Sequence, residues 1–168
     1  MIDTIGAEQK RFQSLLEIVR REGDWLLKTD RRLFNTRLDA AWVERLQEDE
    51  DLAERLDAFV SRFGRMQDTL GEKLLPSLLR SLAEKTGSTL DNLNRAEKLG
   101  LLPSVVEWLD VRNLRNKLIH EYMVDADEFA LALNDAHVWV KSLVAAYNAI
   151  NLFARSRISS TAWPDLLP

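Results

Sequence analysis

One short segment of the chain concentrates side chains that can transfer protons and bind phosphate. It runs from Val111 to Tyr122 and reads VRNLRNKLIHEY. On a helix, Arg112, Asn116 and His120 are each four residues apart and share one face. A histidine titrates near neutral pH and can accept or donate a proton. An arginine presents a planar fork of donors that fits a phosphate.

Together, such groups can cleave RNA without a metal. One group would deprotonate a ribose 2′-hydroxyl, which attacks the adjacent phosphate while an arginine stabilises the developing charge. Arg115, the second arginine, lies about 140° from His120 on an ideal helix. The two share a site only if the arginine reaches round, if the helix ends near His120, or if a second chain completes the site. The alternative interpretation is an ordinary solvated helix face.

Composition restricts the remaining possibilities. The chain has 168 residues, of which 46% are hydrophobic and 30% charged, as in a single globular domain. It has no cysteine, which excludes disulfides and thiolate metal sites. The net charge of −4 means that any contact with nucleic acid requires a local cationic patch. We find no signal peptide and no membrane-spanning run, so we expect a cytoplasmic protein without a membrane segment.

The elements around this segment are predicted to be helical, because apolar residues recur at spacings of three and four. The clearest stripe is Leu52, Leu56, Phe59, Phe63, Met66, Leu70 and Leu74. A second stripe is Phe129, Leu133, Ala136, Val140, Leu143, Tyr147 and Ile150. These patterns predict an all-α fold, a bundle of about four main helices with an additional N-terminal helix and short connecting helices.

Several local signals predict where the helices before residue 80 begin and end. Residues 7–34 have a helical period that Gly23 interrupts, which indicates a bend or a break. Thr36 is predicted to cap a short helix. The acidic residues 48–51 suit the start of the long helix that follows. Pro76 should kink that helix or end its regular part.

Similar signals occur in the second half of the chain. Ser88, with Asp91 three residues later, predicts a capping box at the start of a short helix. Asp125 is predicted to begin the last long helix. His137 on that helix is interpreted as a surface or partly packed side chain, not as a second catalytic group. We find no paired histidines at metal spacing and no glycine-rich phosphate loop, so no metal and no cofactor are expected.

The segment Arg115-Asn116-Lys117-Leu118-Ile119-His120 is similar to the motif of HEPN domains, an arginine and a histidine separated by four to six residues. Asparagine directly follows the arginine, as in that motif. The closer likeness is to HepT-like toxins paired with minimal nucleotidyltransferase antitoxins, in which the motif continues as histidine, any residue, tyrosine. Here Tyr122 fits that position. The resemblance covers roughly residues 50–152.

This resemblance implies a type VII-like toxin acting as a metal-independent endoribonuclease on mRNA or tRNA. Arg115 and His120 would be the catalytic pair, with Asn116 and Arg112 in support. Tyr122 would be the residue that the nucleotidyltransferase antitoxin modifies with AMP. Such domains resemble homodimers whose two motifs face each other across a cleft.

We expect three segments within one domain: an N-terminal helical extension (1–48), a HEPN-like bundle (49–155) and a loosely held tail (156–168). In the family-based alternative, the protein is a non-catalytic substrate-binding subunit of a nucleotidyltransferase. A helical scaffold without a site is a third possibility.

The long helix offers further candidates. Arg62, Arg65 and Asp68 are expected either to line the cleft, if that helix packs against the motif helix, or to form an ordinary surface ion pair.

Overall fold

The computed structural model describes residues 2–120 and 125–168, and side chains for 4–119 and 125–168. All regular structure in these ranges is helical, which confirms the all-α class. The elements are α1 (Ile2–Leu33), α2 (Ala40–Glu44), the 3₁₀ turn η1 (Arg45–Gln47), α3 (Glu50–Asp68), the π-helical turn η2 (Thr69–Leu74), α4 (Leu75–Ser81), α5 (Thr89–Lys98), α6 (Val105–His120) and α7 (Ala126–Arg157).

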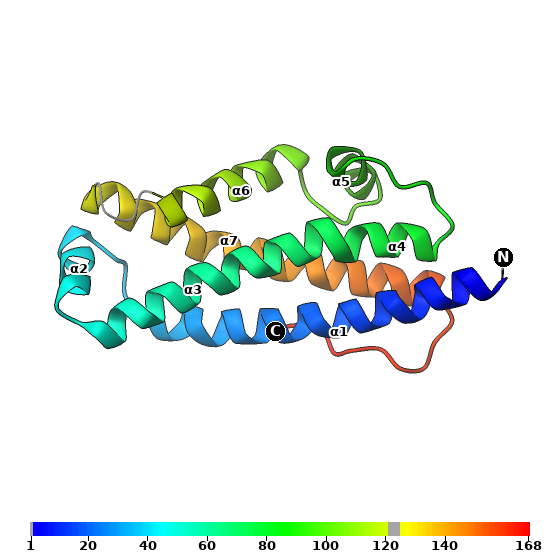
Figure 1. Ribbon diagram of the computed structural model, residues 1–168, viewed down its shortest axis with the longest axis horizontal. Coiled ribbons are helices and arrows are strands. Elements are labelled where there is room, and N and C mark those ends of the chain that lie inside the picture. The colour runs from blue at the N-terminus through cyan, green and yellow to red at the C-terminus, as the bar shows by residue number, and fades with distance from the viewer. Residues whose placement is uncertain (1, 121–124) are drawn as a thin grey trace.

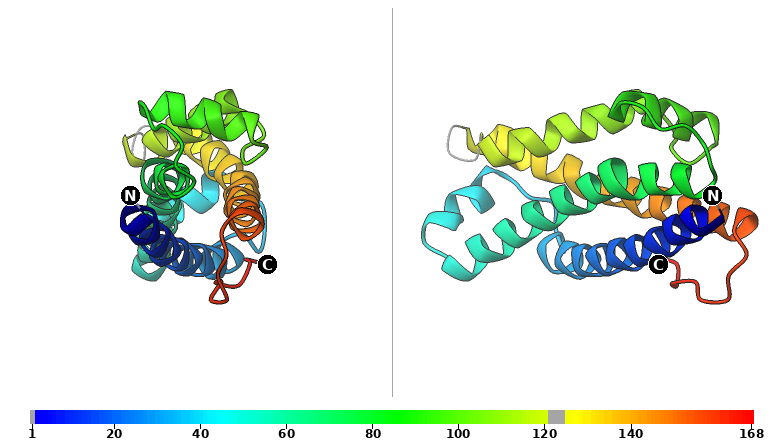
Figure 2. Two further views of the ribbon diagram at one scale, coloured as in Figure 1. Left: turned by 90° about the vertical axis from the view of Figure 1, so that its right-hand side faces the viewer. Right: turned by 45° about the vertical axis from the view of Figure 1, so that its right-hand side comes forward.

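Four long rods make up most of the molecule. Helix α1, the continuous rod α3–η2–α4 and helix α7 lie side by side along the longest axis (Figure 1). The end-on view shows α6 over α3 and α7, on the side away from α1 (Figure 2). The short helix α5 lies near the beginning of α6. The motif segment is therefore held on one flank of a three-rod core.

Both apolar stripes face the core, as their periods predict. Every residue of the two stripes is buried. Helix α1 contributes Phe12, Leu16, Val19 and Leu26, none of which has any solvent exposure. Each such side chain stabilises the fold by roughly 1.5–3 kcal/mol relative to an exposed one. Residues 1–48, expected as an extension, thus include one of the long rods that build the core.

Helix α1 runs without interruption through Gly23, contrary to the predicted bend or break. The glycine has a packing role instead. A Cβ atom there would overlap the side chain of Leu167 and come within 3.0 Å of Met66 Cε. Gly23 therefore leaves space for the C-terminal tail to lie against α1.

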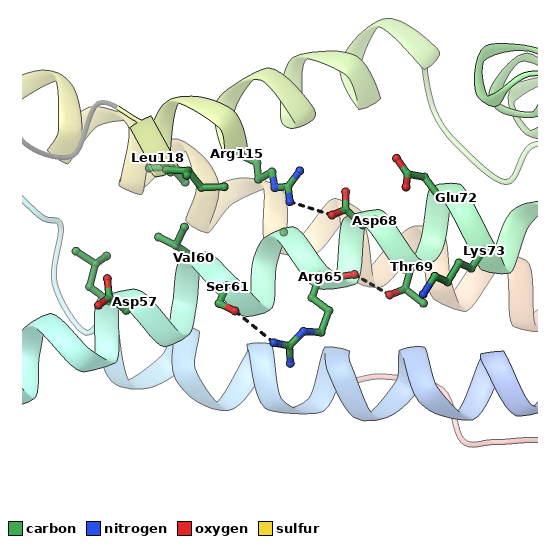
Figure 3. A pocket seen from close by; sticks show the side chains of 13 residues that line it. Asp57, Val60, Ser61, Arg65, Asp68, Thr69, Glu72, Lys73, Arg115 and Leu118 are labelled. Carbon is green, nitrogen blue, oxygen red and sulfur yellow. Dashed lines mark hydrogen bonds and ion pairs between the residues drawn. The ribbon is translucent and has the colours of Figure 1, made fainter.

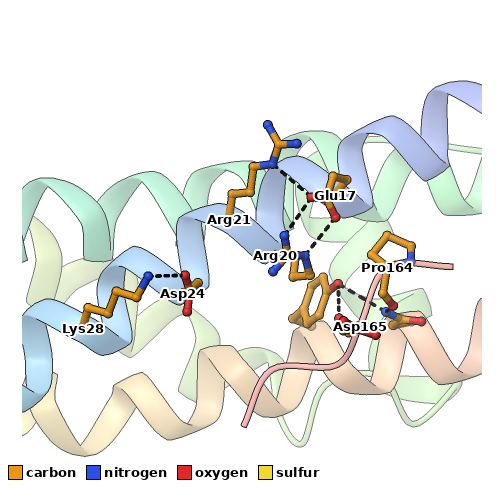
Figure 4. A network of polar contacts seen from close by, with 9 residues as sticks. Glu17, Arg20, Arg21, Asp24, Lys28, Pro164 and Asp165 are labelled. Atoms are coloured by element: carbon orange, nitrogen blue, oxygen red, sulfur yellow. Dashed lines mark hydrogen bonds and ion pairs between the residues drawn. The ribbon is translucent and has the colours of Figure 1, made fainter.

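The tail is fixed to α7, which corrects the expectation of a loosely held segment for residues 156–168. Asn148 makes two hydrogen bonds with the backbone of Leu167, at 2.9 Å each. Asn151 donates to the carbonyl oxygen of Pro164 at 3.1 Å. Figure 4 shows the tail passing between α1 and α7 at Pro164. The Ser/Pro-rich composition of the tail does not indicate these bonds. They depend on Asn148 and Asn151 of α7, whose sequence pattern shows mainly the apolar face of that helix.

Helix starts follow local chemistry. The capping box of Ser88 and Asp91 is confirmed at the start of α5. Asp49 and Asp125 cap α3 and α7, as their positions predict. The cap of α2 is not Thr36 but Asp39, whose carboxylate accepts from the backbone N–H of Trp42 at 2.9 Å.

Pro76 interrupts the regular α-helix without ending the rod. The six residues before α4 form the π-helical turn η2, and α3 continues through it into α4 (Figure 1). Proline lacks an N–H group and its ring crowds the preceding turn, so a wider turn there accommodates it.

Candidate functional site

A groove of about 690 Å³ lies between the α3–η2 rod and α6 (Figure 3). Its charged lining residues are Asp57, Arg65, Asp68, Glu72, Lys73 and Arg115. Leu56, Val60, Leu118 and Ile119 form its apolar end. The motif segment therefore contributes one wall of the groove, and α3 with η2 contributes the other.

Two glycines of the α3–η2 rod allow α6 to approach. A Cβ on Gly64 would come within 2.8 Å of Arg115 Nε, and one on Gly71 within 3.2 Å of the Trp108 ring. Glycine inside a helix costs about 1 kcal/mol relative to alanine. The rod is therefore less stable at these two positions than it would be with alanine, and the glycines allow α6 to pack closely against it.

Arg115 is held at the wall of this groove. Its Nη2 donates to Asp68 Oδ2 at 2.9 Å, and the side chain is 25% exposed. Its Nε is buried against Gly64 and has no hydrogen-bond partner among the described residues. Figure 3 shows the guanidinium in the space between the two walls. The accessible donor that is left for an anion in the groove is therefore Nη1, which has no hydrogen bond among the described residues.

Arg112 follows the same pattern one turn earlier. Its Nη2 donates to Glu72 Oε1 at 3.1 Å, and both side chains are more exposed than the Arg115–Asp68 pair. Exposed ion pairs of this kind contribute about 0–1 kcal/mol to stability. A phosphate that enters the groove would therefore compete only with weakly held carboxylates for the two arginines.

The other motif residues are only partly described. Asn116 is exposed and has no hydrogen bond within the described part of the chain. His120 is the last residue given for α6, and its side chain lies outside the described residues. Tyr122 also lies outside them. That Arg115 and His120 share one site stays a prediction.

The three candidates on α3 separate into two environments. Arg65 and Asp68 line the groove, but they do not pair with each other. Arg62 lies on the other side of α3, where it donates to the Thr29 hydroxyl and sits over the ring of Trp25. The expectation that α3 packs against the motif helix is confirmed. Of the three candidates, Arg65 and Asp68 line the resulting groove and Arg62 does not.

His137 connects α7 to the end of α1. Its Nδ1 lies 2.7 Å from Asp30 Oδ1, and its ring stacks on Phe34 with centroids 4.5 Å apart. Burial raises the pKa of the Asp30 carboxyl, and the hydrogen bond with His137 acts against this rise. The side chain is 40% exposed and does not line the groove, so it is partly packed, as expected.

Sequence reasoning missed Gly64, Gly71 and Glu72. The two glycines are seven residues apart, inside the strongest helical pattern of the chain. Glycine at such positions is unfavourable, so their spacing was a usable signal that another element packs there. Glu72 had no distinguishing signal, because its partner Arg112 lies 40 residues away.

Among the described residues, no group of three or more histidine or acidic side chains is placed to hold a metal ion. Within the same ranges, no helix has the length and apolar character needed to cross a membrane. No family model matches the chain, and no match is found among curated proteins or solved structures.

Proposed function

We propose that this protein is a metal-independent endoribonuclease of the HEPN kind and the toxin of a type VII-like toxin–antitoxin pair. The observation that carries the proposal is the position of Arg115. The arginine of the motif lies in a groove, paired with Asp68 and packed against Gly64. If α6 presented only an ordinary solvated face here, neither a glycine inside the facing helix nor a buried arginine nitrogen without a partner would be expected.

In the proposed reaction, the His120 imidazole of one chain removes the proton from a ribose 2′-hydroxyl. The resulting oxygen attacks the adjacent phosphorus, and the bond to the 5′-oxygen breaks as His120 of a second chain protonates that leaving oxygen. The products are a 2′,3′-cyclic phosphate and a 5′-hydroxyl. Arg115 would stabilise the charge on the phosphate oxygens, with Asn116 and Arg112 in support. The active form is thus a homodimer that acts on mRNA or tRNA in the cytoplasm.

The proposal includes a nucleotidyltransferase partner that silences the toxin. In the transfer of AMP, the Tyr122 hydroxyl, losing its proton, attacks the α-phosphate of ATP and pyrophosphate leaves, which would place a phosphate and a nucleoside two residues from His120. The added phosphate would compete with RNA for Arg115, and the nucleoside would fill space near the cleavage site. Incubating the protein with the partner and ATP should therefore increase its mass by one AMP and end cleavage. Tyr122→Phe should prevent both effects.

The decisive experiment tests cleavage in EDTA. The purified protein should cut single-stranded RNA and leave 2′,3′-cyclic phosphate ends. His120→Ala and Arg115→Ala should each slow cleavage by about 100-fold or more. Arg95→Ala removes the same charge from an exposed ion pair on α5 and should leave the rate unchanged. Cleavage by His120→Ala at the parent rate would show that the catalytic assignment is wrong.

A second candidate function has one observation in its favour. Arg112 and Arg115 are both paired with carboxylates, which reduces the positive charge available to RNA. This favours a non-catalytic subunit that binds a nucleotidyltransferase and its substrate. Such a protein would cut no RNA under any of these conditions, and Arg115→Ala would weaken its complex with the partner.

A further inference from the structure

We propose that single-stranded RNA crosses helix α3, from the groove beneath α6 to a stacking platform on α1. The platform consists of Trp25 with Arg62 and Arg65 beside it. The identity of the polymer as RNA rests on the proposed function. The platform itself rests on the aromatic and charged groups described below.

A second groove, of about 350 Å³, lies on the α1 side of α3. Its lining includes Trp25, Arg62 and Arg65. Arg65 also lines the first groove, so the two grooves meet at this side chain. Figure 3 shows Arg65 pointing from α3 toward α1, whereas Arg115 enters from the side of α6. A strand bound at Arg115 can therefore continue over α3 to Trp25.

Trp25 is the group that identifies the kind of ligand. Its side chain is 54% exposed, although tryptophan is mostly buried in folded proteins. The Lys28 ammonium lies 4.7 Å from the centroid of the Trp25 ring, and the Arg62 guanidinium 5.3 Å. Both cations lie over the ring, and this arrangement suits a nucleotide, because a base can take the place of a cation on the exposed ring while the phosphate meets the cation that it displaces.

The charges around Trp25 favour an anion. Arg62 donates to the Thr29 hydroxyl, and Arg65 makes only a long bond of 3.4 Å to the Ser61 hydroxyl. Neither arginine forms an ion pair with a carboxylate of the described residues. In a chain with a net charge of −4, two such arginines beside an exposed tryptophan supply the local cationic patch that binding to nucleic acid requires.

Glu22 is the acidic residue that lines the second groove, and Asp24 pairs with Lys28 at 2.8 Å beside Trp25. Burial raises the pKa of the Glu22 carboxyl, and the hydrogen bond from the Thr69 hydroxyl acts against this rise. Glu22 Oε2 is buried and has no partner among the described groups. The Glu22 carboxylate is thus turned into the protein and held by Thr69, while the two arginines also line the groove.

The ligand is a single strand and not a duplex. Base stacking on a protein ring requires an unstacked base, which paired RNA does not offer. The platform should therefore prefer single-stranded RNA over a duplex of the same sequence, with little preference among bases.

The test measures binding in a His120→Ala background, so that the probe is not cut. A short labelled single-stranded oligoribonucleotide is titrated at constant salt, and its fluorescence anisotropy is followed. Trp25→Ala should weaken binding about tenfold or more, and Trp25→Phe should retain most of the affinity. Leu152→Ala removes a comparably exposed apolar side chain from α7 and should have no effect. Circular dichroism should show the same helix content in all variants.

The salt dependence provides a second measurement. Replacing Arg62 or Arg65 by alanine should each reduce the slope of log K against log salt by about 0.7. Parent-like affinity and slope in Trp25→Ala and the arginine variants would overturn the platform, and so would a parent protein that binds no single-stranded RNA.

The two proposals can fail separately. If the parent protein cuts RNA and Trp25→Ala binds and cuts equally well, the platform is wrong and the nuclease stands. If the parent cuts nothing but binds single strands through Trp25, the nuclease is wrong and the platform stands.

Discussion

Helix α3 packs against its neighbours in two opposite ways. Toward α1 and α7 it presents large apolar side chains with no solvent exposure, such as Phe59 and Phe63. The Phe59 ring also meets Phe34 edge-on, with centroids 5.0 Å apart. Toward α6, the same helix and its π turn present glycines and carboxylates, and a groove remains between the two walls.

The two faces of α3 meet different requirements, stability on the core side and the proposed function on the α6 side. Where Phe59 and Phe63 pack against the neighbouring helices, the surface of α3 is fully buried, as stability requires. The α6 side departs from this requirement. It contains helix-interior glycines and two buried polar atoms without partners among the described residues, Gln67 Oε1 and Arg115 Nε. Glu22 Oε2, beside the second groove, is a further buried polar atom without a partner among the described residues, so departures of this kind occur at both grooves.

The largest expected effect tests the core side. Phe59→Ala should lower the free energy of unfolding by about 3–5 kcal/mol, because it removes a fully buried ring that the surrounding helices cannot replace. Urea unfolding followed by circular dichroism measures this. Asp57→Ala, exposed on the groove side of the same helix, should change it by less than about 0.5 kcal/mol. Equal effects would remove the contrast between the two faces.

The next effect tests the contact beneath Arg115. In an Arg115→Ala background, Gly64→Ala should raise the free energy of unfolding by about 1 kcal/mol, because alanine favours the helix. With Arg115 present, the added Cβ would lie 2.8 Å from Nε and cancel this gain. A double-mutant cycle in urea should therefore give a coupling of about 1 kcal/mol. No coupling would mean that the arginine does not rest on this glycine.

A smaller effect concerns the charge balance of the groove. Asp68→Asn removes the carboxylate that competes with phosphate for Arg115, so RNA affinity in the His120→Ala background should rise about two- to fivefold. Asp57→Asn makes the same charge change in the same groove, but Asp57 has no ion pair with Arg115. If both variants bind RNA equally well, the gain reflects overall charge and not the release of the arginine.

The smallest effect lies on α1, outside the α6 groove. The hydrogen bond from Arg20, helped by one from Arg21, lowers the pKa of Glu17 from 4.5 to about 2 (Figure 4). Because the folded-state pKa is the lower one, the stabilisation is complete above pH 4.5 and is lost as the pH falls toward 2. After screening by solvent, Glu17→Gln should cost about 0.5–1 kcal/mol at neutral pH. The variant's urea stability should vary less with pH in this window.

The features of the fold that depend on residues close together in the sequence were predictable from it. The apolar stripes and the Ser88 capping box depend on residues three or four positions apart, so their patterns identify them directly. Thr36 and Gly23 were misread because other contacts decide their roles. Asp39 offers a carboxylate at the actual start of α2, and Gly23 faces Leu167, which is remote in the sequence.

The candidate site was predictable in its residues more than in its pairings: Arg65 and Asp68 were expected at the cleft, but Glu72 was not. The motif identifies Arg112 and Arg115 as residues for an anion. It does not indicate that Asp68 pairs with Arg115 or that Glu72 pairs with Arg112, because these contacts depend on how α6 is rotated against a rod 40 or more residues earlier in the chain. Helical periodicity describes which residues share a face, but it does not specify the partner of a polar face.

The π turn η2 makes chain length a determinant of the groove. Gly71 and Glu72 belong to this turn, which holds more residues than a turn of α-helix. Deleting a single residue between 69 and 74 would allow a regular α-helix in which the leucines of α4 still face the interior, because the π turn already holds the additional residue as a bulge. The residues of the turn itself would be repositioned, so Gly71 and Glu72 would no longer both face α6. A homologue one residue shorter at this point is therefore expected to have lost one of these two contacts with α6, whatever amino acids it retains.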